Sequence, residues 1–309
     1  MTNFRGLTSQ LIKANFESSG ILVSATFSYC PICDFGYFYP VPPSNFLNDY
    51  YRRESGGRDY DDALKWVNSY SARQPMYEIF SLMRENGIAP EQFSGKKVLE
   101  VGCGYSQFIP FATRYGMEVT AIEPGEDFAN FIEHVLGVNV MRSMLDELPR
   151  DLYGKFCMLF SRDSLEHHPD PAMSIGVMHD LLEPGGLLVL SVPNLHSFSF
   201  QEMPFSHPYF AFPAHLNYFS CKALRAHLER IGFAIVYITT TTFIGELAYC
   251  MEAAIKLGLI VPDLTVLNQL ASQEQLERIL VFARRTSNLV LSGGAPEGQQ
   301  DVGAESPTR

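Results

Sequence analysis

The sequence predicts an α/β fold built on a doubly wound, mostly parallel sheet, and three observations support this prediction. Strand-like and helical segments alternate from residue 97 to about residue 242, which is typical of a parallel sheet with both faces covered. The apolar strand 98–101 runs directly into the glycine turn 102–104, and a second strand ends at Glu123. Such a unit lets the backbone approach a ligand closely and places an acid where it can bind ribose hydroxyls.

Apolar spacing predicts seven strands and, apart from the insertions described below, two helical regions. The strands are expected near residues 97–101, 117–122, 137–141, 156–161, 187–192, 233–241 and 278–283. Apolar residues at helical spacing predict helix over 59–88, with Gly87 as its stop. The same spacing predicts a helix over 171–182 that stops at the Pro-Gly-Gly sequence 184–186.

The chain divides into three regions. An N-terminal extension over residues 1–58 lacks strong periodicity and carries a Cys-x-x-Cys pair at Cys30 and Cys33. The main domain is expected to span 59–286 and to contain two insertions, an aromatic segment at 193–220 and a helical segment at 244–275. The tail 287–309 is rich in Gly, Ser, Pro, Gln and Glu, a composition that predicts disorder.

Composition limits the classes of partner and the location. The 309 residues carry a formal net charge of −11, and no Lys/Arg stripe is present to neutralise the phosphates of a nucleic acid. No run reaches the roughly 18–20 apolar residues that span a membrane, and the first residues lack the apolar core of a signal peptide. Six cysteines in a chain of this length are not a disulfide framework, so a reducing cytoplasm is expected. A homodimer stays open as an oligomeric state.

The glycine turn favours one class of nucleotide ligand over another. Gln107 stands where the third glycine of a dinucleotide-binding G-x-G-x-x-G motif would be. Glu100 lies at the end of the first strand, where it would repel a pyrophosphate. S-adenosylmethionine has no phosphate and presents an ammonium, a sulfonium and a ribose, so two carboxylates suit it better than they suit NAD.

Further motifs run in order from about residue 75 to residue 240. An acid precedes a G-x-G turn at Glu100, Gly102 and Gly104, with Ser106 in the place of a last glycine. Other matching segments lie at 160–171, 182–194 and 215–233. In this series the chain resembles the class I S-adenosylmethionine-dependent methyltransferases. The resemblance implies a Rossmann-like methyltransferase fold, S-adenosylmethionine as cofactor, a small-molecule acceptor and an antiparallel last strand.

The resemblance also implies a set of cofactor-binding residues. Gly102 and Gly104 provide the close approach of the backbone. Glu123 binds the ribose hydroxyls, and Glu100 orients the loop and the methionine ammonium. The remaining members of the expected cofactor site are Met144 beside the adenine, Asp163 at the end of the fourth strand, and Arg73 for the cofactor carboxylate. A solvated surface position explains Arg73 equally well.

Two histidines are the candidate catalytic residues. His167 lies at the carboxyl end of the fourth strand, where parallel sheets bind ligands, and it aligns with a Glu-His pair of the family. A histidine that caps the next helix is the alternative. His215 lies in segment 193–220, which holds eight Phe or Tyr and three His residues and is longer than an ordinary link. We expect an aromatic lid over a small-molecule pocket, with burial of a surface helix as the alternative.

The Cys30 and Cys33 pair resembles half of the N-terminal zinc knuckle found in methyltransferases of sugar and natural-product clusters. A structural zinc takes four ligands, and the extension offers only one pair of cysteines. No metal site is therefore expected. We interpret the pair as a degenerate remnant whose neighbouring aromatic residues pack on the main domain.

The favoured function is methyl transfer from S-adenosylmethionine to a small molecule, with a sugar or a natural-product intermediate as acceptor. O-methylation with a histidine base is preferred, because Ala214 replaces the Glu that precedes the corresponding histidine of related sugar C-methyltransferases. A non-catalytic scaffold or partner subunit of the same fold is the alternative, to which Ser106 and the missing cysteine pair point. A nicotinamide oxidoreductase is the third hypothesis.

Overall fold

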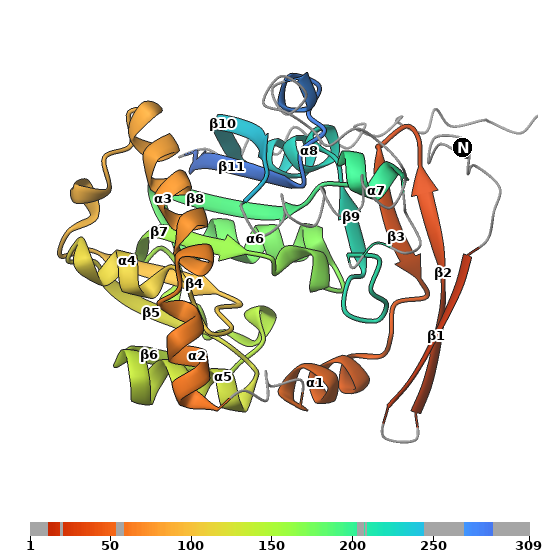
Figure 1. The fold of residues 1–309 in the computed structure, drawn as a ribbon, viewed down its shortest axis with the longest axis horizontal. Helices are drawn as coiled ribbons and strands as arrows, with labels where there is room; N and C mark the ends of the chain where they lie inside the picture. The colour runs from red at the N-terminus through yellow and green to blue at the C-terminus, as the bar shows by residue number, and fades with distance from the viewer. Residues whose placement is uncertain are drawn as a thin grey trace, which may run out of the picture.

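The computed structural model describes residues 12–18, 21–53, 59–202, 207, 209–243 and 269–286. They form a large and a small sheet (Figure 1). The large sheet has seven strands in the order β10-β11-β8-β7-β4-β5-β6. These strands are β4 (Lys97–Val101), β5 (Glu118–Ile122), β6 (Asn139–Met141), β7 (Phe156–Arg162), β8 (Leu182–Pro193), β10 (Phe233–Thr241) and β11 (Arg278–Arg285).

The large sheet confirms the predicted fold class, and all seven expected strands are present. Strands β4 to β8 pair in parallel, whereas β11 runs antiparallel to both β8 and β10. The chain passes from β4 through β5 to β6 at one edge and returns as β7 on the other side of β4. The carboxyl ends of β4 and β7 therefore meet at the switch point, where doubly wound sheets bind ligands.

Helices cover both faces of this sheet (Figure 1). On one face, Ile175 and Met178 of α6 and Leu224 of α8 are buried in the same core as β4, β7 and β8. On the other face, Met76 of α3 and Phe111 of α4 belong to a second core. The helices are α2 (Tyr60–Val67), α3 (Tyr70–Glu85), α4 (Ile109–Arg114), α5 (Glu126–Phe131), α6 (Pro171–Leu181) and α8 (Cys221–Ile231), and the short turns are η2 (Pro90–Phe93), η3 (Ile132–Leu136), η4 (Leu145–Glu147), η5 (Arg150–Leu152) and η6 (Leu165–His167).

Two helix predictions need correction. The expected helix over 59–88 is divided into α2 and α3, because the Ser69 side chain accepts the Ala72 amide N–H and caps a new helix. The expected helix over 171–182 ends at Leu181, before the Pro-Gly-Gly sequence that was predicted to stop it. Leu182 already pairs with Phe156 of β7, so 184–186 lie within β8.

The N-terminal extension is a second region that the sequence prediction described incompletely. It contributes β1 (Ile12–Ser18), β2 (Ile21–Cys30) and β3 (Phe35–Tyr39), followed by α1 (Ser44–Arg53). These strands form an antiparallel four-stranded sheet with β9 (Asn217–Phe219), which comes from segment 193–220. The prediction missed them although Val23, Ala25 and Phe27 alternate inward along β2, a period typical of a half-buried strand.

Aromatic side chains join the small sheet to segment 193–220, which also holds α7 (Phe198–Glu202). Phe27 and Phe38 pack with Phe200 of α7 and Tyr218 of β9 in one buried cluster. The ring centroids of Phe38 and Phe212 lie 4.9 Å apart. The aromatic residues of this segment thus bury the N-terminal sheet, in addition to any role beside a pocket.

Replacing Phe38 by alanine is expected to destabilise the protein by about 3–5 kcal/mol, the usual cost of removing a buried phenylalanine. The side chain is 1% exposed. Urea denaturation followed by circular dichroism measures this change in the free energy of unfolding. Tyr39→Ala is the control, because Tyr39 is 66% exposed on the same strand and its loss should change stability by less than about 0.5 kcal/mol. Equal effects of the two substitutions would contradict the prediction.

Parts of the expected insertions and tail cannot be compared with the structure. Residues 244–268 of the expected helical insertion and the tail 287–309 lie outside the described residues. Within the described ranges, no helix is both long enough and apolar enough to cross a membrane.

Candidate active site

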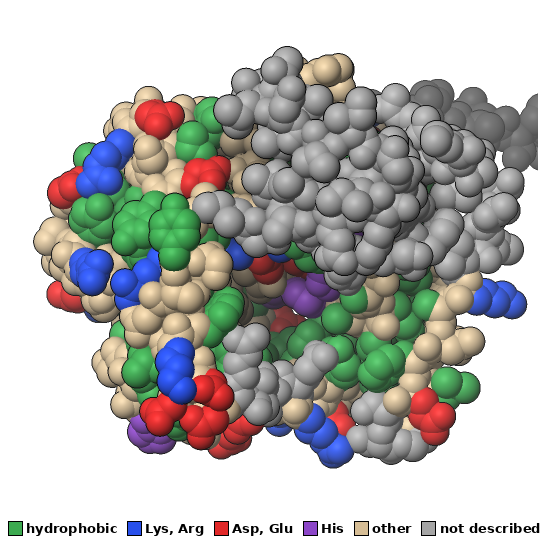
Figure 2. Space-filling view, in the orientation of Figure 1, with side chains coloured by type: hydrophobic (Ala, Val, Ile, Leu, Met, Phe, Trp, Pro, Cys, Tyr) green, Lys and Arg blue, Asp and Glu red, His purple; other side chains and the backbone are tan. Residues whose placement is uncertain are grey.

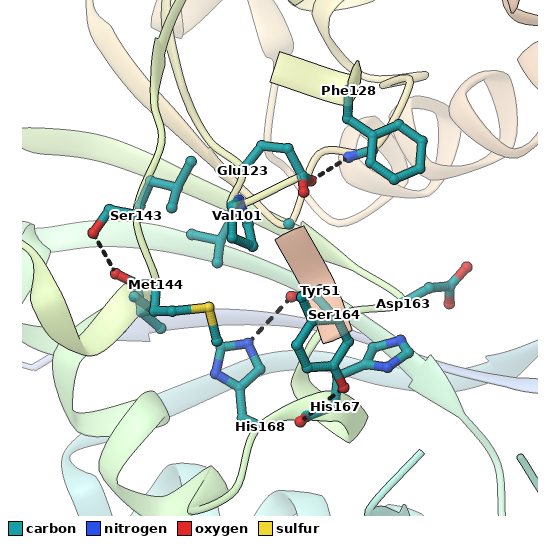
Figure 3. Close-up of a pocket in the computed structure, with 15 residues that line it drawn as sticks. Tyr51, Val101, Glu123, Phe128, Ser143, Met144, Asp163, Ser164, His167 and His168 are labelled. Carbon is teal, nitrogen blue, oxygen red and sulfur yellow. Dashed lines mark hydrogen bonds between the residues drawn. The ribbon is translucent and has the colours of Figure 1, made fainter. Parts of the chain in front are cut away.

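A cavity of about 390 Å³ lies at the carboxyl ends of β4, β5 and β7 (Figure 3). In Figure 2 this face of the molecule is hollowed, and histidine and acidic side chains are visible inside the hollow. Six of the predicted site residues line the cavity: Gly102, Gly104, Glu123, Met144, Asp163 and His167.

The two glycines of the turn after β4 have different structural roles. Both have positive φ angles, +67° at Gly102 and +49° at Gly104, a conformation that favours glycine. A Cβ at Gly102 would lie 2.3 Å from Ser164 Oγ, whereas a Cβ at Gly104 would meet no atom within 4 Å. Gly102 therefore allows the turn to pack on the loop after β7, and Gly104 leaves its backbone open to a ligand.

Glu123, at the end of β5, is held in place by two backbone amides, and Figure 3 shows its side chain at the cavity. One carboxylate oxygen accepts the Gly104 N–H and the other accepts the Gly125 N–H, each at 2.8 Å. Burial raises the pKa of this carboxyl, and the two amide bonds act in the opposite direction. Each oxygen keeps a lone pair for a ligand hydroxyl, so the turn and the acid form one preorganised unit.

Glu100 lies beneath the same turn and is bound by Ser106. The Ser106 hydroxyl donates to a Glu100 carboxylate oxygen at 2.7 Å and accepts the Ile109 N–H at 2.9 Å. Ser106 itself has a φ of +41°, so it adopts the left-handed conformation in which a glycine would be unstrained. The departure from glycine at this position therefore adds a hydrogen bond to the buried acid.

Burial raises the pKa of Glu100 to about 8 from 4.5, partly offset by the Ser106 hydrogen bond and increased by the charge of Glu123. The folded protein therefore binds a proton here that the unfolded chain loses near pH 4.5. Stability falls as pH rises wherever the folded state binds more protons. The contribution of protonated Glu100 to the free energy of unfolding is fully present below about pH 4.5 and is lost as pH rises through about 8.

Replacing Glu100 by glutamine is expected to remove this loss of stability at alkaline pH. Thermal unfolding of the wild type and the variant at pH 5 and pH 9 measures it. The difference in melting temperature, variant minus wild type, should be larger at pH 9 than at pH 5. A difference that is the same at both pH values would show that Glu100 titrates normally in the folded protein.

A second cavity of about 370 Å³ shares Gly102, Gly104, Phe128 and Asp163 with the first. Glu100 and Arg162 are among its lining residues. The sequence reasoning missed Arg162. Its guanidinium donates to the Gln107 side-chain oxygen, and its Nε lies 3.5 Å from Asp163 Oδ2. Its position as the last residue of a strand beside the glycine turn was the available signal.

Arg73 is not brought to either cavity, and its proposed contact with a cofactor carboxylate has no support in the fold. It lies in the first turns of α3, where its guanidinium donates to Asn68 and to the Val67 carbonyl. These hydrogen bonds tie the Arg73 side chain to the C-terminal end of α2. Arg162 is the arginine that lines the second cavity.

Asp163 lies between the two cavities and is paired with a buried arginine of β11. Its carboxylate accepts a hydrogen bond from Arg278, which also donates to the Tyr209 hydroxyl. Burial alone would raise the pKa of Asp163, but the charges of Arg278 and Arg162 outweigh it and lower the pKa. Asp163 is therefore ionised at the cavity wall. Met144 lies on the side of the first cavity opposite Asp163, and Figure 3 shows its thioether sulfur there.

His167 and His215 lie together on the side of the first cavity away from the glycine turn. Their ring centroids are 4.7 Å apart, with the planes nearly perpendicular. His167 lines the cavity, whereas His215 stands behind it and is not among the lining residues. Burial lowers the pKa of His167, and it lowers the pKa of His215 to about 3. Both imidazoles are therefore neutral at pH 7.

The tautomer of His167 follows from its hydrogen bond. Nδ1 lies 2.8 Å from the Ala214 carbonyl oxygen, which can only accept, so Nδ1 carries the proton and Nε2 has a lone pair. The Tyr51 hydroxyl donates to the same carbonyl at 3.0 Å, and the Tyr51 ring contacts the His167 ring edge-on. Sequence reasoning missed Tyr51, because nothing in the extension marks it as a pocket residue.

Comparison with known families identifies the domain. A family model described as a methyltransferase domain matches residues 71–238, which include the glycine turn, Glu123 and His167. The chain belongs to this methyltransferase family. The predicted recognition, a family of S-adenosylmethionine-dependent methyltransferases, and the predicted cofactor class are confirmed. The nicotinamide and non-catalytic hypotheses are not favoured.

Curated relatives of this methyltransferase match part of the chain. It is 34% identical over 138 residues to a ubiquinone biosynthesis O-methyltransferase of Azotobacter vinelandii. This alignment covers 43% of this chain and 59% of the relative. A protein of the same name from Acinetobacter baylyi is 31% identical over 140 residues, covering 43% and 58%. The match thus spans less than two thirds of these relatives.

Solved structures resemble this methyltransferase in fold. One is phosphoethanolamine N-methyltransferase 2 of Haemonchus contortus, in complex with S-adenosyl-L-methionine, with a TM-score of 0.53 at 13% identity. The superposition covers 89% of this chain and 71% of the Haemonchus chain. Geranyl diphosphate C-methyltransferase of Streptomyces coelicolor has the same TM-score and identity, with coverages of 79% and 99%. At this level of identity the likeness concerns the fold alone.

Proposed function

We propose that this methyltransferase transfers a methyl group from S-adenosylmethionine to a hydroxyl oxygen of a small molecule, a sugar or a natural-product intermediate. The observation that carries the proposal is the joined pair of cavities, with two carboxyls at the glycine turn and the His167 lone pair at the far side. The name of the partial relatives, O-methyltransferase, supports oxygen as the accepting atom.

The residues present fit the cofactor. Gly104 leaves open space beside its backbone, and Glu123 keeps lone pairs for the ribose hydroxyls. Met144 lies where it would flank the adenine. In the second cavity, the two charged side chains Arg162 and Asp163 match the carboxylate and the ammonium of the methionine end, with Glu100 behind the turn. The bound cofactor supplies a methyl group on a sulfonium, which is a good electrophile.

His167 handles the acceptor hydroxyl in this proposal. Its neutral Nε2 can take the hydroxyl proton as the oxygen attacks the methyl carbon. The Ala214 carbonyl fixes the ring through Nδ1–H and stabilises the imidazolium that forms. His215 packs on the ring and keeps water from it. The other contribution of the protein is alignment of the two reactants.

Calorimetric titration with S-adenosylmethionine and with S-adenosylhomocysteine tests the cofactor site. A panel of phenolic and sugar hydroxyl acceptors, assayed by release of S-adenosylhomocysteine, tests the reaction. Binding of both cofactor forms and turnover with one hydroxyl class is the expected result. Absence of binding heat at millimolar cofactor would overturn the proposal, and methylation only of amines or carbon acids would refute oxygen as the acceptor.

A further inference from the structure

Three side chains that can bind a metal ion converge beside the first cavity. Glu166 and His167 come from η6, the turn after β7, and His215 comes from the loop before β9. Each offers a ligand atom, and these atoms lie within 4.8 Å of one another. Backbone contacts hold the two loops together: the Leu216 N–H donates to the Glu166 carbonyl at 2.9 Å.

Glu166 is an isolated buried acid. Its side chain is 1% exposed, and neither carboxylate oxygen has a hydrogen-bond partner among the described residues. Most buried polar atoms in proteins have a partner, and burying a charged group without one is costly. Glu166 therefore lacks a group with positive character.

The Nε2 atom of His167, which can accept a hydrogen bond, lies near this acid. Because Nδ1–H donates to Ala214, the Nε2 lone pair remains, and Nε2 lies 3.9 Å from Glu166 Oε1. At 3.9 Å the two atoms are too far apart for a hydrogen bond, so neither satisfies the other. A cation between them would satisfy both.

His215 completes the set from the opposite loop. Its ring is held between the edge of His167, with centroids 4.7 Å apart, and the stacked ring of Tyr209 at 5.9 Å. The nearby cation Arg278 is bound to Asp163 and to the Tyr209 hydroxyl. Arg278 is thus engaged by groups other than Glu166. Burial raises the pKa of Glu166 to about 8, so a bound metal ion would displace a proton from this carboxyl.

We propose that Glu166, His167 and His215 bind a divalent transition-metal ion such as Zn²⁺ or Co²⁺. Two imidazole nitrogens and one carboxylate oxygen are a donor set that these ions prefer. A tetrahedral ion bonded at about 2.0–2.2 Å separates its ligand atoms by about 3.4 Å, so only a small inward movement of the side chains is needed. Three protein ligands leave a position open for an oxygen of the acceptor, as in catalytic metal sites.

The role of this ion in catalysis rests on the proposed function, whereas its binding does not. With the ion bound, Nε2 of His167 would be a ligand and could not take a proton. The ion would lower the pKa of the bound acceptor hydroxyl, which would lose its proton to solvent before the oxygen attacks the methyl carbon. In metal-free protein, Nε2 takes the proton directly.

Metal binding is tested on untagged protein stripped with a chelator, in a Cys30→Ser, Cys33→Ser background, because the thiol pair is itself a ligand for these ions. Titration with Co²⁺ is followed by visible absorption, and bound Zn²⁺ is measured by elemental analysis. About one equivalent should bind. His215→Ala and Glu166→Gln should each weaken Co²⁺ binding by more than about 100-fold, beyond the usual effect of an outer-shell partner. His134→Ala, at an exposed histidine, should bind as the wild type does.

The outcomes separate this inference from the proposed function. Absence of Co²⁺ absorption, or equal binding by the wild type and His215→Ala, would overturn the metal site. Thermal unfolding of each variant checks that the fold is kept, and titration with S-adenosylhomocysteine checks the cofactor cavity. Loss of metal with cofactor binding intact is the expected result. Loss of cofactor binding in the wild type would instead count against the proposed function.

Discussion

Replacing His167 by glutamine should lower kcat by about 10²–10⁴-fold, the range that a positioned acid–base group contributes. Glutamine lacks an imidazole lone pair at the position of Nε2. It therefore neither takes the proton of the substrate hydroxyl nor binds an ion as histidine does. The Kd for S-adenosylhomocysteine should change little, because His167 lies on the side of the cavity away from the glycine turn. Release of S-adenosylhomocysteine with the preferred acceptor measures kcat.

The matched control for this experiment is His134→Gln, which alters an exposed histidine on η3. Its kcat should equal that of the wild type. If His167→Gln also keeps the wild-type kcat, then His167 has no part in the reaction and serves only to hold the Ala214 loop.

Replacing Glu123 by alanine should weaken binding of S-adenosylmethionine and S-adenosylhomocysteine by about 1–3 kcal/mol, or about 5–150-fold in Kd. The carboxylate would bind ribose hydroxyls through charge-assisted bonds, and it also holds the amides of Gly104 and Gly125. Both losses act in the same direction. Isothermal titration calorimetry measures the two dissociation constants.

Glu126→Gln is the control for this substitution, since Glu126 is an exposed acid three residues further on, at the start of α5. Its Kd should match that of the wild type. An unchanged Kd in Glu123→Ala would show that the ribose binds elsewhere, while a raised Kd for both variants would indicate a general effect of charge.

The large sheet was predictable because its strands are short apolar runs separated by glycine turns and helical spacing. β4, β5, β7 and β11 were each located within about two residues. The N-terminal strands were not recognised, because their aromatic content is equally typical of a loop against a core. In addition, β3 pairs with β9, which lies about 180 residues away in sequence. Only the alternation of Val23, Ala25 and Phe27 could have indicated β2.

The candidate site was predictable where it lies on strand ends and not where it depends on remote loops. Gly102, Gly104 and Glu123 are adjacent because parallel strands end at one edge. Tyr51 was missed, since it reaches the site through a contact that no local pattern encodes. Arg162 was missed although its place at the end of β7 was a usable signal. The role of Arg73 stays a prediction: it does not line either cavity, and its position before the first strand gave no information about the direction of its side chain.

One carbonyl, that of Ala214, accepts hydrogen bonds from both Tyr51 and His167, and the next strand, β9, completes the N-terminal sheet. The described residues of 12–53 and 194–220 therefore form a single structural unit. A chimera that exchanges one of these segments between related enzymes would join mismatched surfaces, whereas exchange of both together would transfer the acceptor preference with the cofactor half left untouched.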